Sequence, residues 1–332
     1  SLLQHLNQTI TAQLVCFRDG PFAEEARQMG IPTMICGGNN VFRTRRKLAA
    51  YIREGGYEII HCHGSRANMI GAMLRKVTGL PVVTTVHSDY RLDYMGRPLS
   101  HLTFGTINAL ALRRLDYRIG VSDAMVDLLI SRGFPADRFY TIYNGIDFTP
   151  PPTQGDRLEY LRSLGEDVDE NSVVVGLAAR LNTVKDMATL VRGFAAGHAK
   201  CPRLRLLIAG DGPEKDKLTA LAAELGVVRQ VCCAGWISGG MDRFYSALDI
   251  NALTSLSETF PYALTEGARF HLATVSTAVG GIPYLIDQDV NGYLFQPGDW
   301  QALGNDLAAL GNDDELRRRL GEKLYEKAST QF

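Results

Sequence analysis

The sequence lacks most features that mark secreted, metal-binding or membrane-spanning proteins. Its six cysteines are dispersed, and no two have the two-residue gap of a zinc knuckle or redox motif. No apolar run is long enough to span a bilayer, and the first residues do not form a signal peptide. These absences predict a reducing, cytoplasmic environment. The sequence given begins at Ser1 and not at a methionine, so an export signal upstream of Ser1 stays an alternative.

Charge is unevenly distributed, although the formal net charge is only −1. Residues 1–150 carry 17 Lys and Arg against 12 Asp and Glu, whereas the remainder carries 18 against 24. Such asymmetry is typical of two domains with different partners. The basic run 43–47 suits anionic lipid, although a solvated helix face is the more ordinary interpretation. Basic residues are not interleaved with aromatic ones, so nucleic acid is not an expected partner.

Short apolar runs alternate with segments of helical period along the whole chain. Such runs are typical of parallel strands buried on both faces between helices. The expected strands are 13–17, 57–62, 82–86, 117–121, 139–142, 172–177, 204–209, 231–234, 250–253, 273–276 and 292–295. The proline-rich segment 149–155 predicts a linker, which divides the chain into domains 1–150 and 151–332. Ligands of two doubly wound domains are expected at the carboxyl ends of their strands, in a cleft between them.

An acidic pair surrounds a predicted helix start in the second domain. Glu258 precedes Pro261, which suits a first helical turn, and Glu266 lies inside the helix. The amides of residues 260–263 would be unpaired donors at a positive helix end, which favours a pyrophosphate. Each carboxylate then needs its own hydroxyl partner, such as a ribose diol or a sugar hydroxyl. Alternatively, Glu266 is an ordinary exposed helix carboxylate, and the pair alone is a weak signal.

Two cations follow an earlier predicted strand. Arg180 and Lys185 lie five residues apart on one loop, where a guanidinium fork and an ammonium can grip a diphosphate. The ordinary alternative is a pair of exposed loop cations. The next strand leads into Gly210-Asp211-Gly212, which lacks the three-glycine spacing of a dinucleotide fingerprint and does not predict NAD binding. These glycines are expected to let the backbone pass close to a ligand or a neighbouring strand.

In this order, these segments resemble the GT4 family of retaining glycosyltransferases. Arg180 and Lys185 match the diphosphate-binding pair of that family. Glu258 and Glu266 match its two-glutamate motif with seven intervening residues. Further matches are the segments 61–63, 85–87, 143–147, 278–283 and 289–299. The resemblance implies a GT-B fold, with two doubly wound Rossmann-like domains facing a central cleft.

The resemblance also assigns roles to residues. Glu266 is expected to bind the ribose hydroxyls, Glu258 to contact the donor sugar near its reacting carbon, and His87 to face that sugar from the first domain. The catalytic candidates are His87, Glu258, Arg180 and Lys185. The donor-binding candidates are Arg180, Lys185, Gly212, Trp236, Ile237, Glu258, Phe260, Pro261, Tyr262, Ala263 and Glu266. His61 and His63 have metal-pair spacing but no third ligand, so a structural or acceptor-side role is expected.

The implied reaction moves a sugar from a nucleoside-diphosphate sugar, with UDP favoured, to a hydroxyl of a sugar or lipid-linked acceptor. Cell-surface glycan, polysaccharide or glycolipid synthesis is the expected setting, with peripheral contact at the inner membrane face. Arg180 and Lys185 would stabilise the leaving diphosphate, and no convincing Asp-x-Asp site is found, so neither a cofactor nor a metal is expected. A nucleotide-sugar epimerase, a phosphorylase and a catalytically degenerate scaffold are the alternatives. The family's first strand and Gly-rich loop are expected before Ser1, and the last family helix beyond Phe332.

Overall fold

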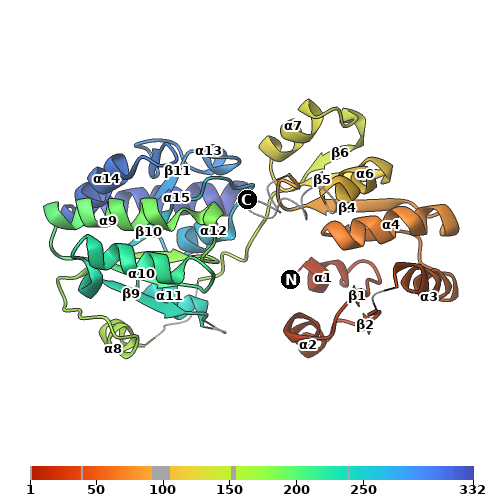
Figure 1. The fold of residues 1–332 in the computed structure, drawn as a ribbon, viewed down its shortest axis with the longest axis horizontal. Helices are drawn as coiled ribbons and strands as arrows, with labels where there is room; N and C mark the ends of the chain where they lie inside the picture. Colours follow the sequence, from red (N-terminus) through yellow and green to blue (C-terminus); the bar gives the residue numbers. More distant parts are fainter. Residues whose placement is uncertain (1, 39, 92–104, 151–154, 238–239) are drawn as a thin grey trace. The chain divides into compact units, whose positions relative to one another are not determined.

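The structure is a computed structural model, which describes residues 2–38, 40–91, 105–150, 155–237 and 240–332 (Figure 1). Contacts divide the chain into two compact units. Unit 1 comprises Ser1–Gly120 and Ile130–Tyr140, and unit 2 comprises Val121–Leu129 and Thr141–Phe332. The domain boundary at residue 150 stays a prediction.

Unit 1 contains two parallel sheets among its described residues. Strands β1 (Leu14–Cys16) and β2 (Thr33–Ile35) form a pair, and the second sheet has the order β3-β4-β5-β6. The strands of this second sheet are β3 (Ile60–His63), β4 (Val82–Val86), β5 (Tyr117–Gly120) and β6 (Phe139–Thr141). The helices of unit 1 are α1 (Leu2–Leu6), α2 (Pro21–Gln28), α3 (Val41–Glu54), α4 (Ser65–Thr78) and α6 (Thr106–Arg114), whereas most of α7 (Asp123–Ser131) belongs to unit 2.

Unit 2 has one parallel six-stranded sheet of order β12-β11-β10-β7-β8-β9. Its strands are β7 (Val173–Ala178), β8 (Leu204–Ala209), β9 (Val231–Gly235), β10 (Ile250–Leu253), β11 (Ala273–Thr277) and β12 (Tyr293–Phe295). Its helices are α8 (Arg157–Ser163), α9 (Met187–Lys200), α10 (Lys215–Glu224), α11 (Met241–Ser246), α12 (Tyr262–Arg269), α13 (Ile282–Leu285), α14 (Trp300–Asn312) and α15 (Asp314–Gln331). The strand order reverses between β7 and β10, which makes this pair the switch point of a doubly wound sheet.

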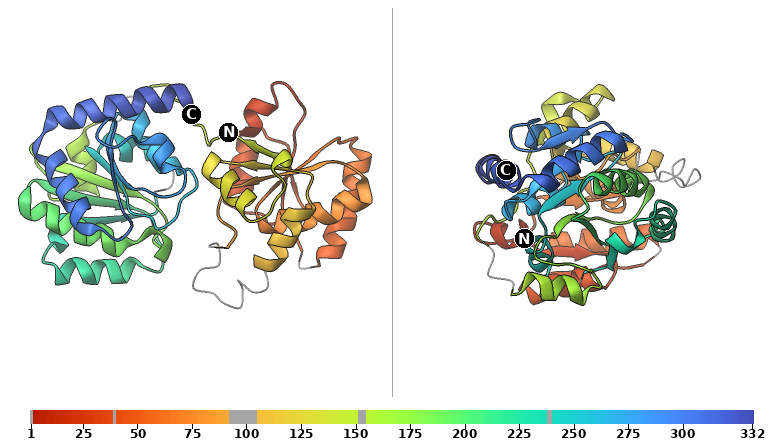
Figure 2. Two further views of the ribbon diagram at one scale, coloured as in Figure 1. Left: turned by 90° about the horizontal axis from the view of Figure 1, so that it is seen from above. Right: turned by 90° about the vertical axis from the view of Figure 1, so that its left-hand side faces the viewer.

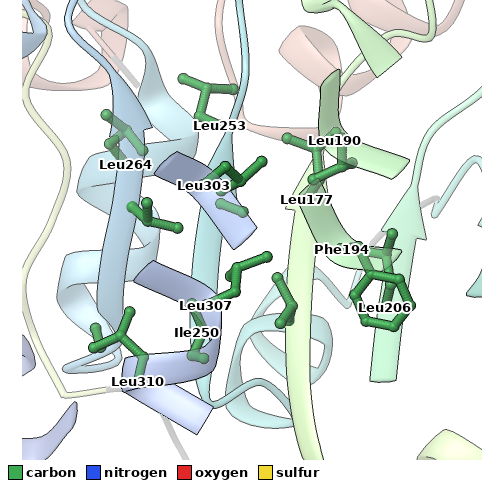
Figure 3. Close-up of a cluster of buried hydrophobic side chains, with 14 of the residues drawn as sticks. Leu177, Leu190, Phe194, Leu206, Ile250, Leu253, Leu264, Leu303, Leu307 and Leu310 are labelled. Atoms are coloured by element: carbon green, nitrogen blue, oxygen red, sulfur yellow. The ribbon is translucent and has the colours of Figure 1, made fainter. Parts of the chain in front are cut away.

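Hydrophobic residues on both faces hold the unit 2 sheet between layers of helices (Figure 2). Val173 and Val175 of β7 belong to one core cluster with residues of α9 and α14, whereas Val174 belongs to another with residues of α8 and α11. Figure 3 shows Leu303 and Leu307 of α14 gathered with strand residues of the first cluster. Successive strand side chains point to opposite faces, so a continuous apolar run fills both layers.

The strands observed agree with the apolar runs in the sequence, with one omission. Strands β4, β8 and β10 have the predicted bounds, and β3 begins three residues later than predicted. Strand β2 was not predicted, because its three residues are too few for a period to be recognised. In each unit, strands that are consecutive in the sequence lie side by side, as in β3-β4-β5-β6 of unit 1 and β7-β8-β9 of unit 2. The strand expected before Ser1 stays a prediction.

Candidate functional site

The candidate donor site is built on the two loops at the switch point of the unit 2 sheet. One loop follows β7 and carries Arg180 and Lys185, and the other follows β10 and carries Glu258. Because β7 and β10 are hydrogen-bonded neighbours, their carboxyl ends lie side by side. Ligands of doubly wound sheets bind at this position.

Hydrogen bonds tie these two loops together. The Leu256 amide donates to the carbonyl of Val184 over 2.8 Å. The hydroxyl of Thr254, which is fully buried, donates to the carbonyl of Lys185 over 2.8 Å. Asp186 adopts a left-handed φ of 47° and caps α9 through the amide of Thr189. The backbone beside Lys185 is therefore fixed from both sides, and Thr254 is a positioning residue that the sequence interpretation did not include.

Lys185 and Glu258 form an ion pair across the two loops. Only 21% of the Lys185 side chain and 12% of the Glu258 side chain are exposed. Arg180 differs, because it is exposed and its guanidinium has no partner among the described residues. The site therefore holds one cation matched by a carboxylate and a second cation available to an anion.

Two glycines bring the loop that follows β8 against the loop that carries Arg180. A β-carbon at Gly210 would overlap the carbonyl oxygen of Ala179, and one at Gly212 would overlap that of Leu181. The close approach lets the Leu181 amide donate to the carbonyl of Asp211 over 2.9 Å. Both glycines have positive φ, of 148° and 155°. Of the two roles expected for these glycines, the structure shows close passage of a neighbouring backbone segment.

A second glycine pair supports the loop of Glu258. Gly280 has a φ of 54°, and a β-carbon there would overlap the carbonyl oxygen of Glu258. The Gly281 amide donates to the carbonyl of Thr259 over 2.8 Å. The segment 278–283, which resembles a family motif, thus has a structural role in fixing the backbone of Glu258.

Helix α12 begins directly after this loop, with Pro261 as its N-cap residue. Its first amide groups have no partners inside the helix, which gives the helix start a partial positive charge. Phe260 is buried, and its ring packs edge-on against Tyr143 at 5.0 Å between centroids. Asn144 donates from Nδ2 to the carbonyl of Phe260 over 2.9 Å. Phe260 can therefore serve a ligand only through its backbone, whereas Tyr262 is exposed and Ala263 half-buried at the helix start.

Glu266 lies inside α12 and is hydrogen-bonded rather than freely solvated. The hydroxyl of Tyr245, on α11, donates to Oε2 of Glu266 over 2.8 Å. Burial raises the pKa of Tyr245, so this tyrosine stays a donor at neutral pH. The bond fixes one oxygen of Glu266 and leaves lone pairs for a hydroxyl ligand. Tyr245 gave no signal in the sequence, because it lies on another helix.

Trp236 and Ile237 follow β9, the edge strand two positions from β7 in the sheet. The indole of Trp236 is 76% exposed, whereas Ile237 packs against the core cluster of α8 and α11. Gly235 has a φ of 71°, and its carbonyl accepts the Gly210 amide over 2.7 Å. An exposed aromatic ring at a strand end suits stacking on a base.

His87 lies in unit 1, directly after β4, and it has a histidine partner. Its Nε2 lies 2.9 Å from Nδ1 of His63, and Nε2 of His61 lies 2.8 Å from the hydroxyl of Thr85. These residues keep exposed surface, but crowding removes water from the imidazole rings. This desolvation lowers the pKa of His61 and His87, and it lowers that of His63 to about 4 with a contribution from its two histidine neighbours.

Two absences hold for the part of the chain that the structure describes. Within it, no three His, Cys, Asp or Glu side chains are grouped as metal ligands would be. Likewise, none of its helices is both long and apolar enough to cross a membrane.

Comparison with protein families gives a match over each part of the chain. Residues 162–327 match the family described as glycosyl transferases group 1. Residues 1–149 match glycosyltransferase family 4. Together the two matches include every candidate site residue named above.

Curated relatives carry glycosyltransferase names. The chain is 25% identical over 294 residues to N-acetyl-alpha-D-glucosaminyl L-malate synthase of Bacillus anthracis, with 86% of this chain and 74% of the relative covered. It is 28% identical over 313 residues to D-inositol 3-phosphate glycosyltransferase of Mycobacterium sp. (strain KMS), with 88% and 67% covered.

Solved structures share the fold. The Anabaena protein HepE in complex with UDP-glucose aligns with a TM-score of 0.84 at 24% identity, over 97% of this chain and 87% of that one. Sucrose-phosphate synthase from Thermosynechococcus elongatus aligns with a TM-score of 0.75 at 22% identity, over 90% and 76%. These neighbours are GT-B glycosyltransferases, so the predicted fold class is confirmed.

Proposed function

This chain belongs to the group 1 glycosyltransferases, and from that premise we propose that it moves a sugar from a nucleoside-diphosphate sugar to an acceptor hydroxyl with retention of configuration. The observation that carries the proposal is the arrangement at the switch point of unit 2. There Arg180, Lys185 and Glu258 lie on two loops that follow adjacent parallel strands, and those loops are joined by hydrogen bonds. The start of α12 adds its positive end directly after Glu258.

In this proposal, electrostatic stabilisation of the leaving group supplies most of the catalysis. Negative charge collects on the diphosphate as the bond from the anomeric carbon to its oxygen breaks. Arg180, Lys185 and the amides at the start of α12 stabilise that charge, with no reorganisation at the moment of reaction. The acceptor oxygen bonds to the anomeric carbon on the face that the diphosphate leaves, and the hydroxyl proton passes to the diphosphate. The family resemblance implies this step without a covalent intermediate.

We assign the donor nucleotide as UDP and its contacts as follows. Glu266 binds the ribose hydroxyls, Trp236 and the backbone of Ile237 meet the base, and Glu258 contacts the sugar. The support for uridine is that the structural neighbour HepE was solved with UDP and with UDP-glucose. No metal ligand is assigned in this proposal, because the two cations and the helix start supply the positive charge.

The acceptor is proposed to be anionic or lipid-linked. The names of two relatives specify L-malate and inositol 3-phosphate, which are both anions. The first 150 residues are basic, and α3 exposes Arg43, Arg46 and Lys47, which suit peripheral contact with an anionic inner membrane face. A cytoplasmic role in glycan, polysaccharide or glycolipid synthesis would follow. An acceptor screen in which only neutral sugars react would contradict this part of the proposal.

Calorimetric titration with UDP, GDP and ADP tests the donor site. We expect UDP to bind best and the Glu266→Ala variant to lose roughly tenfold in affinity, because its carboxylate accepts from the ribose. Glu224→Ala, an exposed glutamate on α10, is the matched control and should bind normally. Release of UDP from UDP-sugars in the presence of acceptors then separates a transferase from a scaffold, which binds without turnover. Absence of binding by a folded sample would contradict the proposal.

A further inference from the structure

Two asparagine side chains from distant segments hold the first turn of α12, which the proposed function assigns to the diphosphate. Nδ2 of Asn144 donates to the carbonyl of Phe260 over 2.9 Å, and Nδ2 of Asn251 donates to the carbonyl of Ala263 over 2.9 Å. Asn251 lies on β10, whereas Asn144 lies in the segment that follows β6. All four residues belong to unit 2. The roles assigned above include neither asparagine.

Asn251 anchors α12 to its own sheet. The Asn251 side chain is buried, and a β-carbon at Gly267 would overlap its Nδ2. Glycine at position 267 therefore lets the strand side chain reach the carbonyl of Ala263, one turn earlier in the helix. Leu264 and Ala268 add apolar contacts to the core cluster of the same sheet. The body of the helix is thus attached to the sheet without any contribution from Asn144.

Asn144 is placed by its neighbour Tyr143. The hydroxyl of Tyr143 donates to Oδ2 of Asp123 over 2.8 Å. The Tyr143 ring packs edge-on against Phe260 at 5.0 Å and against Phe332 at 4.8 Å between centroids. The amide of Asn144 therefore reaches the carbonyl of Phe260 from a segment that has its own contacts with the fold.

The carbonyl of Phe260 is an unusual acceptor, because the next residue is Pro261. The peptide bond between them has no N–H, so the carbonyl oxygen, with its partial negative charge, is its only polar group. The amides that follow, of Tyr262 and Ala263, are donors available to an anion. A carbonyl oxygen turned toward the same anion would repel it. The bond from Asn144 fixes the direction of this oxygen.

We propose that Asn144 is a positioning residue for the anion-binding start of α12. Its amide holds the peptide between Phe260 and Pro261 in one orientation, which keeps the carbonyl oxygen away from the anion. The amides of Tyr262 and Ala263 are thereby aimed at the terminal phosphate of the nucleoside diphosphate. The presence of a diphosphate rests on the proposed function, whereas the link between Asn144 and the helix start rests on the geometry alone.

Calorimetric titration with UDP and UMP tests this role, because UMP lacks the terminal phosphate. Asn144→Leu keeps nearly the shape of asparagine and removes the donor. We expect it to lower the affinity for UDP by roughly threefold to tenfold, as on loss of one hydrogen bond, and to change that for UMP by less than about twofold. Damage to the fold in general would weaken both nucleotides alike.

Asn312→Leu is the matched control for the titration. Nδ2 of Asn312, on α14, also donates to a backbone carbonyl over 2.9 Å, that of Ala308. This variant should bind UDP and UMP as the unmodified chain does. Equal losses of UDP and UMP affinity in Asn144→Leu, or no loss of UDP affinity, would overturn the proposal. Should Asn144→Leu not fold, Asn144→Ala takes its place, with Asn312→Ala as its control.

Amide hydrogen exchange in the absence of nucleotide tests the link between Asn144 and the helix. The Leu264 amide donates to the carbonyl of Pro261 over 3.2 Å, within the first turn of α12. We expect Asn144→Leu to speed its exchange by roughly threefold to tenfold. The Leu303 amide, which donates to the carbonyl of Asp299 over 3.2 Å at the start of α14, should exchange as before.

Unchanged exchange of the Leu264 amide, or equal acceleration of the Leu264 and Leu303 amides, would contradict the link. If even the unmodified chain binds neither nucleotide, the proposed function fails, and the exchange rates still decide whether Asn144 holds the helix start.

Discussion

The ammonium of Lys185 is ion-paired with the carboxylate of Glu258, although 73 positions separate the two residues in the chain. In this pair, the carboxylate of Glu258 occupies a position beside the Lys185 ammonium that the proposed diphosphate would also occupy. A diphosphate that binds the Lys185 ammonium must therefore either share it with the Glu258 carboxylate or displace that carboxylate. This competition gives Glu258 two separable effects, one on binding and one on transfer.

Glu258→Gln should separate these effects. We expect transfer to fall by at least about a hundredfold, as on loss of a charged group acting in the transition state. UDP should bind as before or up to about fivefold more tightly, because Lys185 loses an ionic partner. UDP release and calorimetry measure the two quantities, with Glu170→Gln as the exposed control. Full activity would remove Glu258 from the mechanism, and weaker UDP binding would contradict the competition.

Lys185→Ala should weaken UDP binding roughly tenfold or more, since one charge-assisted contact is lost. The matched control is Lys217→Ala on α10, where 75% of the lysine side chain is exposed and its ion pair is with Glu214. Calorimetry on both variants provides the comparison. Equal affinities would mean that the diphosphate binds away from the β7 loop.

Gly210→Ala should disturb the loop of Arg180, because the new methyl group would overlap the carbonyl oxygen of Ala179. We expect a loss of at least about 2 kcal/mol in the free energy of unfolding, from overpacking and an unfavourable φ. Gly226→Ala is the control, since its φ of 73° is also positive but no atom lies within 4 Å. Urea unfolding of both variants separates the clash from the backbone cost. Equal losses would show that the close approach is not required.

The buried carboxyl of Glu166 should make stability depend on pH. This residue is only 4% exposed, its Oε1 has no hydrogen-bond partner, and burial raises its pKa to about 7. Between pH 4.5 and 7 the folded chain keeps a proton that the unfolded chain has released, so stability falls as pH rises through this window. Glu166→Gln should remove that loss, which amounts to about 3 kcal/mol at pH 8.

Urea unfolding at pH 5 and pH 8 measures the effect of Glu166→Gln. We expect the variant and the unmodified chain to differ by no more than about 1 kcal/mol at pH 5, where Glu166 is protonated in the folded chain, and the variant to be clearly the more stable at pH 8. Glu170→Gln, at an exposed position in the same loop, should follow the unmodified chain at both pH values. A variant without a stability gain at pH 8 would show that Glu166 is ionised there at no cost.

Much of the fold and several site residues were predictable because the signals are local in sequence. The run 204–209 is apolar except for Arg205 and is bounded by turn residues, so it predicts both ends of β8 correctly. The spacing of Glu258 and Glu266 is a property of the chain, as is the pair Arg180 and Lys185. Resemblance to a family needs only such ordered motifs, which is why the fold class could be predicted from them.

The partners of these residues were decided by the tertiary structure. Lys185 contacts the loop of Glu258 because β10 lies beside β7 in the sheet. Neither strand's own sequence predicts this strand order. Tyr245 reaches Glu266 from another helix, and His63 meets His87 through the register of β3 on β4. The sequence by itself determined which side chains are charged, which can form hydrogen bonds and which segments are apolar, because these are properties of single residues and short spacings. Only the packed sheet determined which groups touch, because contact depends on strand order and register across distant segments.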